Sequence, residues 1–297
     1  YILFTFILYN DTVKKFDSLR GQSADMKKIK SVYIVVLIFS ILASTILALL
    51  RDIALVNEFD TELRFYESDS FLPKAFGILT VWFIAAILIF CILEKKSMSI
   101  VRPSNEPAAS LFLSSLISFV LAAFFGFKLF YGGDMGVIDT ALLIFTLPAA
   151  CYMIFRSFGA LSENIKFLLG IAMVLWFFCL VLSVYFESGV AINNPNRKVE
   201  LTYICFLMMY FVSECKYKIK NQNPERYIFF GFSSVIIGGL YSLPNVILLL
   251  FGRYPDSASI PTEIILFLLW IYVILHMCLF MRDIDEAVTE DEAESDF

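Results

Sequence analysis

Long apolar runs alternate with short polar connections along most of the 297 residues of the chain. A helix needs about 20 mostly apolar residues to cross the hydrocarbon core of a bilayer, because each residue adds only about 1.5 Å. Such runs therefore predict membrane-spanning helices. Six of them contain no charged residue: Ser31–Leu50, Ala75–Leu93, Pro107–Phe127, Phe167–Phe186, Tyr227–Gly252 and Ile264–Met281.

Two further runs are weaker candidates for a crossing. Thr140–Phe155 is slightly short, and Leu201–Ser213 is clearly short and lies between Glu200 and Glu214. Thr140–Phe155 reaches full length if Asp139 lies at the interface. Leu201–Ser213 is counted as a crossing, because otherwise the basic residues from Lys216 to Arg226 would lie on the outer side. The predicted fold is an all-α, polytopic transmembrane helical bundle with about eight full spans. The nine apolar residues Tyr1–Tyr9 are expected to form the end of another helix, as a partial N-terminal span.

Lysine and arginine are concentrated in every second connection, which is typical of loops on the cytoplasmic side. This pattern predicts a multi-pass protein of the cell membrane, with its basic loops and its C-terminal tail in the cytoplasm. The four basic connections are Asn10–Lys30, Glu94–Glu106, Arg156–Lys166 and Glu214–Arg226.

Composition separates the chain into three parts. With 59% hydrophobic and 17% charged residues, it carries less charge than the roughly 25% of a soluble domain. Residues 1–30 are expected to hold the partial helix and a basic loop, and residues 31–281 the bundle. Residues 282–297 contain eight acidic residues and one arginine, so we expect a disordered, solvated tail. The outer connection Arg51–Lys74 fits either a surface helix or a continuation of the preceding helix.

One predicted span carries a small residue at every fourth position. Small residues on one helix face allow another backbone to approach closely. We therefore predict a helix-packing seam, which is favoured over a polar stripe lining a water-filled path. Its members are Ser110, Ser114, Ser118, Ala122 and Gly126.

The run Tyr227–Gly252 has the least regular composition of the predicted spans. Gly238 and Gly239 lower its helix propensity, and Pro244 removes a backbone hydrogen bond just before Asn245. Interrupted helices of this kind form substrate sites in many transporters, but proline kinks are also common in membrane helices. These four residues are thus candidates for a substrate path or for a simple helix break.

The sequence contains few residues that are candidates for catalysis or ligand binding. His276, the only histidine, is expected to make a hydrogen bond to a neighbouring helix or to serve as a proton or substrate site. A zinc site needs several converging ligands, and no such set, cofactor motif or catalytic motif is evident. We therefore predict neither a metal nor a cofactor. Glu214 and Glu263 are expected within a turn or two of an interface, so no deep carboxylate is predicted.

These observations predict an integral membrane protein and leave its specific role open. The favoured interpretation is a non-catalytic accessory or sensor component that acts through helix contacts. The alternative is a secondary transporter or permease for a small molecule, and the least favoured is a lipid-active enzyme. The expected partners are the lipid bilayer and either another membrane protein or a second copy of the chain, but not nucleic acid.

Overall fold

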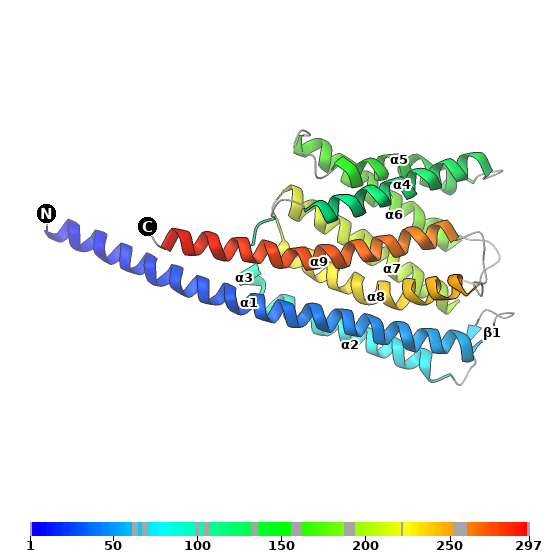
Figure 1. Cartoon of the computed structure of the whole chain (residues 1–297), viewed down its shortest axis with the longest axis horizontal. Helices are drawn as coiled ribbons and strands as arrows, with labels where there is room; N and C mark the ends of the chain where they lie inside the picture. Colours follow the sequence, from blue (N-terminus) through cyan, green and yellow to red (C-terminus); the bar gives the residue numbers. More distant parts are fainter. Residues whose placement is uncertain are drawn as a thin grey trace.

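The computed structural model is a bundle of long helices, drawn in Figure 1. It describes residues 2–60, 65–66, 70–98, 101–103, 107–131, 136–155, 162–186, 194–220, 222–251 and 260–295. Within those ranges it describes the side chains from Ile29 to Glu286, except those of Asp60, Phe65, Lys96, Ser97 and Tyr131. The long helices are α1 (Ile2–Asn57), α2 (Leu72–Leu93), α4 (Ala108–Tyr131), α5 (Val137–Phe155), α6 (Glu163–Phe186), α7 (Pro195–Glu214), α8 (Pro224–Leu250) and α9 (Ile260–Ser295).

Four short elements complete the described part of the chain. β1 (Phe59–Asp60) and β2 (Phe65–Tyr66) pair antiparallel between α1 and α2. α3 (Lys95–Met98) follows α2, and the π-helical turn η1 (Cys215–Ile219) continues directly from α7.

The predicted all-α transmembrane bundle is confirmed. In the described part of the chain, seven helical segments are long and apolar enough to cross a membrane, and they account for all of the predicted spans except Leu201–Ser213. That run lies in α7, a helix of 20 residues whose first turns carry Arg197, Lys198 and Glu200. These charges lower its apolar character, although the helix is as long as a crossing requires.

α8 occupies the centre of the bundle. It packs against α1, α2, α7 and α9, whereas α4, α5 and α6 form a neighbouring group in which α4 contacts α9 and α6 contacts α7 (Figure 1). Most of the residues of α8 are buried, while α2 exposes large apolar side chains such as Ile78, Val81 and Trp82. Such an outer face is stable in lipid, where apolar side chains need no protein partner.

Both ends of the chain are helical where sequence analysis expected a loop and a disordered tail. α1 runs without a break through residues 10–30, and α9 continues to Ser295. Neither segment contains proline, and alanine, glutamate and lysine are good helix formers, so charge alone does not end a helix. The two helices contact each other, and both termini lie at the same end of the molecule (Figure 1).

The connection between α1 and α2 resolves the alternatives left open for Arg51–Lys74. α1 continues to Asn57, so the first part is an extension of the preceding helix and not a separate surface helix. β1 and β2 follow it, with the Phe59 and Tyr66 rings packed edge to face at 5.2 Å.

Candidate functional site

The junction between α7 and η1 brings a carboxylate into the interior. Glu214 is the last residue of α7 and is fully buried, and the π-helical turn begins at the next residue. A π turn holds one residue more than an α-helical turn and shifts the following side chains around the axis, and such turns are frequent at functional sites. Glu214 and Tyr217 meet different residues of the same helix, α9 (Ile260–Ser295), as described below.

Three tyrosines donate hydrogen bonds to the Glu214 carboxylate. The Tyr272 hydroxyl lies 2.7 Å from Oε1, the Tyr152 hydroxyl 3.1 Å from Oε2 and the Tyr210 hydroxyl 3.4 Å from Oε1. The donors come from α9, α5 and α7, so the carboxylate joins three helices. Burial of an unpaired carboxylate is very costly. The three hydrogen bonds therefore allow a charged Glu214 side chain to be buried here.

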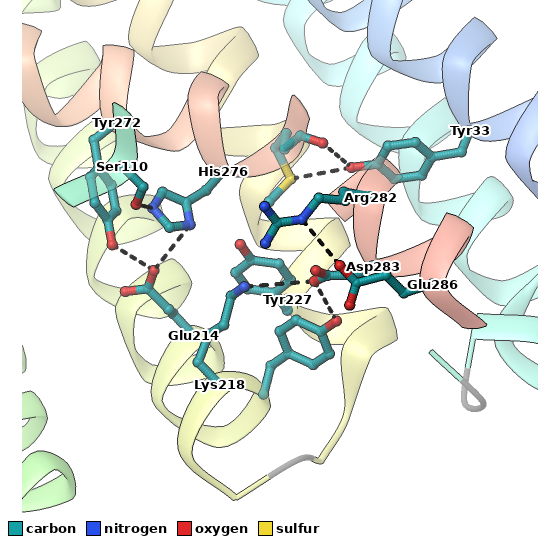
Figure 2. A network of polar contacts seen from close by, with 12 residues as sticks. Tyr33, Ser110, Glu214, Lys218, Tyr227, Tyr272, His276, Arg282, Asp283 and Glu286 are labelled. Carbon is teal, nitrogen blue, oxygen red and sulfur yellow. Dashed lines mark hydrogen bonds and ion pairs between the residues drawn. The ribbon is translucent and has the colours of Figure 1, made fainter. Parts of the chain in front are cut away.

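His276 lies beside this carboxylate and is buried with it (Figure 2). Its Nδ1 is 3.8 Å from Glu214 Oε1, and its Nε2 is 3.0 Å from the Ser110 hydroxyl of α4. The hydrogen bond to a neighbouring helix that we expected from His276 is therefore present. A carboxylate and an imidazole at this distance can hold one proton between them, or two when both are protonated.

Close packing supports the cluster from α6. A Cβ added at Gly170 would overlap the Cys215 sulfur and would lie 3.3 Å from the Tyr152 ring. The Cys215 sulfur is itself 3.4 Å from the Tyr152 hydroxyl. The absence of a side chain at Gly170 is thus what lets η1 and Tyr152 approach each other.

A second buried carboxylate comes from α9. Asp283 on α9 is buried and accepts a hydrogen bond of 2.8 Å from the Tyr217 hydroxyl. Lys218 Nζ is 3.6 Å from the same oxygen, and Tyr227 lies between Asp283 and Glu214 in Figure 2. The Tyr217 and Tyr227 rings are stacked at 4.8 Å, and the Tyr227 and Tyr210 hydroxyls are 3.4 Å apart.

A third polar cluster surrounds the proline of α8. Arg51 Nη1 donates to the carbonyl oxygens of Leu240 and Tyr241, at 2.8 and 2.9 Å. The Leu240 carbonyl is the one that Pro244, lacking an N–H, cannot engage. The guanidinium of α1 therefore replaces the missing backbone donor.

From α9, Glu263 completes this cluster. Its carboxylate accepts hydrogen bonds from the Tyr241 hydroxyl and, at 3.0 Å, from Asn245 Nδ2. The segment of α8 around Pro244 is thus held from two sides, by Arg51 through the backbone and by Glu263 through side chains.

The structure separates the residues proposed for a substrate path or helix break. Pro244 and Asn245 belong to the Arg51–Glu263 cluster, whereas His276 belongs to the Glu214 cluster. A Cβ at Gly238 would overlap Trp270 and lie 2.8 Å from the Tyr203 ring, and one at Gly239 would overlap the Ser44 hydroxyl. Both glycines are therefore positions of close helix contact. Whether any of these residues contacts a substrate stays a prediction.

The residues of the predicted packing seam lie in two different environments. Ser110, Ser114 and Ser118 are buried, and the Ser118 hydroxyl donates to the Ala150 carbonyl of α5 at 2.9 Å. Ala122 is exposed, and nothing lies within 4 Å of a Cβ built at Gly126. Four successive steps of four residues rotate a helix face by about 160°, so a ladder of this length turns from the interior to the surface. The seam as a contributor to stability stays a prediction.

Sequence analysis missed Glu214 as a buried carboxylate. It lies at the end of a short apolar run, and we placed it near an interface. One signal could have revealed it, because Tyr203, Tyr210 and Tyr217 recur every seven residues, a spacing that in a regular α-helix drifts by only about 20° per step. All three tyrosines are buried. A row of buried hydroxyls next to a glutamate indicates a polar interior.

Among the residues that the structure describes, no three His, Cys, Asp or Glu side chains are grouped so as to hold a metal ion. Comparison of the chain with protein-family models, with curated proteins and with solved structures gives no match. The function is therefore inferred from the geometry of the buried clusters.

Proposed function

We propose that this integral membrane protein is a proton-responsive sensor or accessory component, with the Glu214–His276 pair as its proton-binding site. The observation that carries the proposal is the burial of a carboxylate and the only histidine 3.8 Å apart inside the bundle. Ionisable groups inside membrane bundles are costly to bury, and they commonly mark functional sites. A histidine also titrates in the physiological range unless its surroundings shift it strongly.

The chemistry of the pair links protonation to helix packing. With a proton on His276 and none on Glu214, the two groups form an ion pair between α9 and the end of α7. A second proton leaves a net positive charge, whereas the loss of the first leaves a net negative charge. Either change is unfavourable in a medium of low dielectric constant, so it favours a rearrangement of α4, α7 and α9, the helices that hold the pair.

The proposal also includes the orientation of the chain in the membrane and the partners that it contacts. We place the protein in the cell membrane, with Lys218 and the acidic C-terminal segment on the cytoplasmic side, because basic residues favour that side. α9 links the proton-binding site directly to this C-terminal segment. A partner membrane protein, or a second copy of this chain, would receive the signal through helix contacts.

One experiment tests the proton-binding site. We expect the thermal stability of the purified protein in lipid nanodiscs, and its tryptophan fluorescence, to change between about pH 5 and pH 8, where histidine titrates. Glu214→Gln and His276→Gln should each abolish this transition.

Glu263→Gln provides a matched control, because Glu263 is also a buried carboxylate with a tyrosine donor but lies in another cluster. It should retain the transition. A wild-type protein that shows no transition in this pH range would contradict the proposal, and so would a transition that persists in both Glu214→Gln and His276→Gln.

A second candidate function is a proton-coupled secondary transporter. The observation that favours it is Pro244 inside the central helix α8, which leaves a backbone carbonyl group for Arg51. Transporters often bind substrates where the backbone hydrogen bonds of a membrane helix are interrupted. In proteoliposomes that contain a pH-sensitive dye, a transporter would move protons when a substrate gradient is imposed, whereas a sensor would not.

A further inference from the structure

Basic side chains at the η1 end of the bundle differ in whether a carboxylate pairs with them. Lys30, Lys218 and Arg282 each form an ion pair with a carboxylate of α9: Asp285, Asp283 and Glu286, respectively. Within the described ranges, no carboxylate forms an ion pair with a second set of basic residues, which come from α6, η1 and α8: Lys166, Lys216, Lys220 and Arg226.

The lysine that ends η1 lies against α6. Lys220 Nζ is 4.1 Å from the centre of the Phe167 ring, and the Lys220 side chain is exposed. Lys166 immediately precedes Phe167 in the first turns of α6 and is half-buried. A lysine that covers an apolar ring with its stem keeps its ammonium group at the edge of the hydrocarbon region. Two lysines from different elements thus lie at the beginning of α6.

A second contact between α6 and η1 lies one turn further along α6. Gly170 lies against Cys215, whose sulfur would overlap a Cβ added at the glycine. Lys216 follows Cys215 and precedes Lys220 by four residues, which is close to one helical turn, so the two lysines lie on nearly the same face of η1. The close approach at Gly170 therefore gathers the charges of three lysines at the junction of α6 and η1.

The positive charge at this junction is not balanced by nearby acids. Glu163 and Glu225 lie in the first turns of α6 and α8, and among the described residues neither forms an ion pair with the three lysines. α6 is long and apolar enough to cross a membrane, so its first turns lie where lipid headgroups meet the protein. Ammonium groups bind phosphate as point charges, and basic sites between membrane helices bind anionic headgroups.

We propose that the junction of α6 and η1 binds the phosphate headgroup of an anionic lipid through Lys166, Lys216 and Lys220. The acyl chains of this lipid lie along the apolar surface of α6 that follows Phe167, where Leu168 and Ile171 are exposed. The proposal goes beyond the proton-binding site and does not depend on it.

Native mass spectrometry of the purified protein in detergent, titrated with phosphatidylglycerol or phosphatidylcholine at constant neutral pH, tests this site. The first phosphatidylglycerol should bind at least about tenfold more tightly than the first phosphatidylcholine. Lys166→Gln, Lys216→Gln and Lys220→Gln should each weaken phosphatidylglycerol binding by about fivefold, which corresponds to about 1 kcal/mol. Phosphatidylcholine binding should stay unchanged in these variants, and Lys220→Arg should retain tight binding of phosphatidylglycerol because it keeps the charge.

Lys128→Gln is the matched control, because Lys128 Nζ also lies over a phenylalanine ring, that of Phe124 at 6.0 Å, but in the last turn of α4. It should leave phosphatidylglycerol binding unchanged. Equal affinity of the wild type for the two lipids would overturn the proposal, and so would unchanged phosphatidylglycerol binding in all three lysine-to-glutamine variants of the junction.

Two further measurements identify the ligand and separate this site from the proton-binding pair. An equal concentration of inorganic phosphate should not displace phosphatidylglycerol. Complete displacement would show that the junction binds free phosphate and would overturn its assignment to a lipid. Glu214→Gln should keep the preference for phosphatidylglycerol, so the loss of the pH transition and the loss of lipid binding are separate results.

Discussion

At the scale of single residues, the glycines are as informative as the polar side chains. Gly239 lies against Ser44 of α1, with the Ser44 Cβ 2.9 Å and the Ser44 carbonyl oxygen 3.1 Å from the position of an added Cβ. Gly126 of α4 has no atom within 4 Å of the same position. Two glycines in apolar helices of one chain thus have opposite physical roles, and only the first permits a close helix contact.

Gly239→Ala should therefore destabilise the protein by about 1–3 kcal/mol, the usual cost of overpacking a tightly filled site. Thermal unfolding in detergent micelles measures the effect. Gly126→Ala is the control, and it should be neutral or slightly stabilising, because alanine is the better helix former. Equal effects of the two substitutions would show that α1 and α8 do not approach each other closely at Gly239.

At the scale of elements, α8 is a helix whose hydrogen bond lost at Pro244 is replaced by its neighbours. The Leu240 carbonyl receives its hydrogen bond from Arg51 of α1, and Asn245 and Tyr241 are held by Glu263 of α9. A buried carbonyl without a donor costs about 1–3 kcal/mol. The geometry of α8 therefore depends on α1 and α9 as well as on its own sequence.

This dependence predicts a coupling between Arg51 and Pro244. In Pro244→Ala, residue 244 regains an N–H that can bond the Leu240 carbonyl, so Arg51→Met should cost less stability in that background than in the wild type. We expect a coupling free energy of about 1 kcal/mol from a double-mutant cycle measured by unfolding in detergent. Strictly additive effects would contradict the role of Arg51 as the replacement donor.

At the scale of the whole molecule, stability should depend on pH through groups at the edge of the bundle. Tyr217 lies in η1, just beyond the end of α7, and its pKa is raised well above the ordinary value by burial first and by the negative charge of Asp283 second. The folded protein thus keeps the Tyr217 proton at a pH at which the unfolded chain, with a tyrosine pKa of about 10, has lost it.

The contribution of Tyr217 to stability is therefore complete below about pH 10 and declines as the pH rises further, by up to about 1.4 kcal/mol per pH unit. Unfolding free energies of the wild type and of Tyr217→Phe, compared from pH 8 to pH 11, measure this decline. The difference between the two proteins should be constant up to about pH 10 and then shrink. A difference that does not change with pH would show that Tyr217 is not buried against Asp283.

Much of the architecture could be predicted from the sequence because lipid imposes a simple rule. Backbone polar groups must be paired within each segment, so an apolar run of sufficient length in a membrane forms a helix. This rule located the helices that contain Ser31–Leu50 and Ile264–Met281, and it also predicted a helix over Leu201–Ser213. Residues 10–30 and 282–295, where a high charge indicated a loop and a tail, are helical in the structure, because the residues themselves favour a helix.

The candidate site depends entirely on how the helices pack. Length and apolarity of a run describe one helix at a time, and they hold no information on which side chains of different helices meet. Glu214 and His276 are separated by many residues, and Arg51 is far in sequence from the carbonyl that it bonds, so only the packing of α1, α4, α7, α8 and α9 brings these groups together. The amino-acid sequence alone specified that the chain forms membrane helices, because that depends on the transfer of each segment into lipid. The packing of the helices specified which charges are buried and paired, because that depends on contacts between segments.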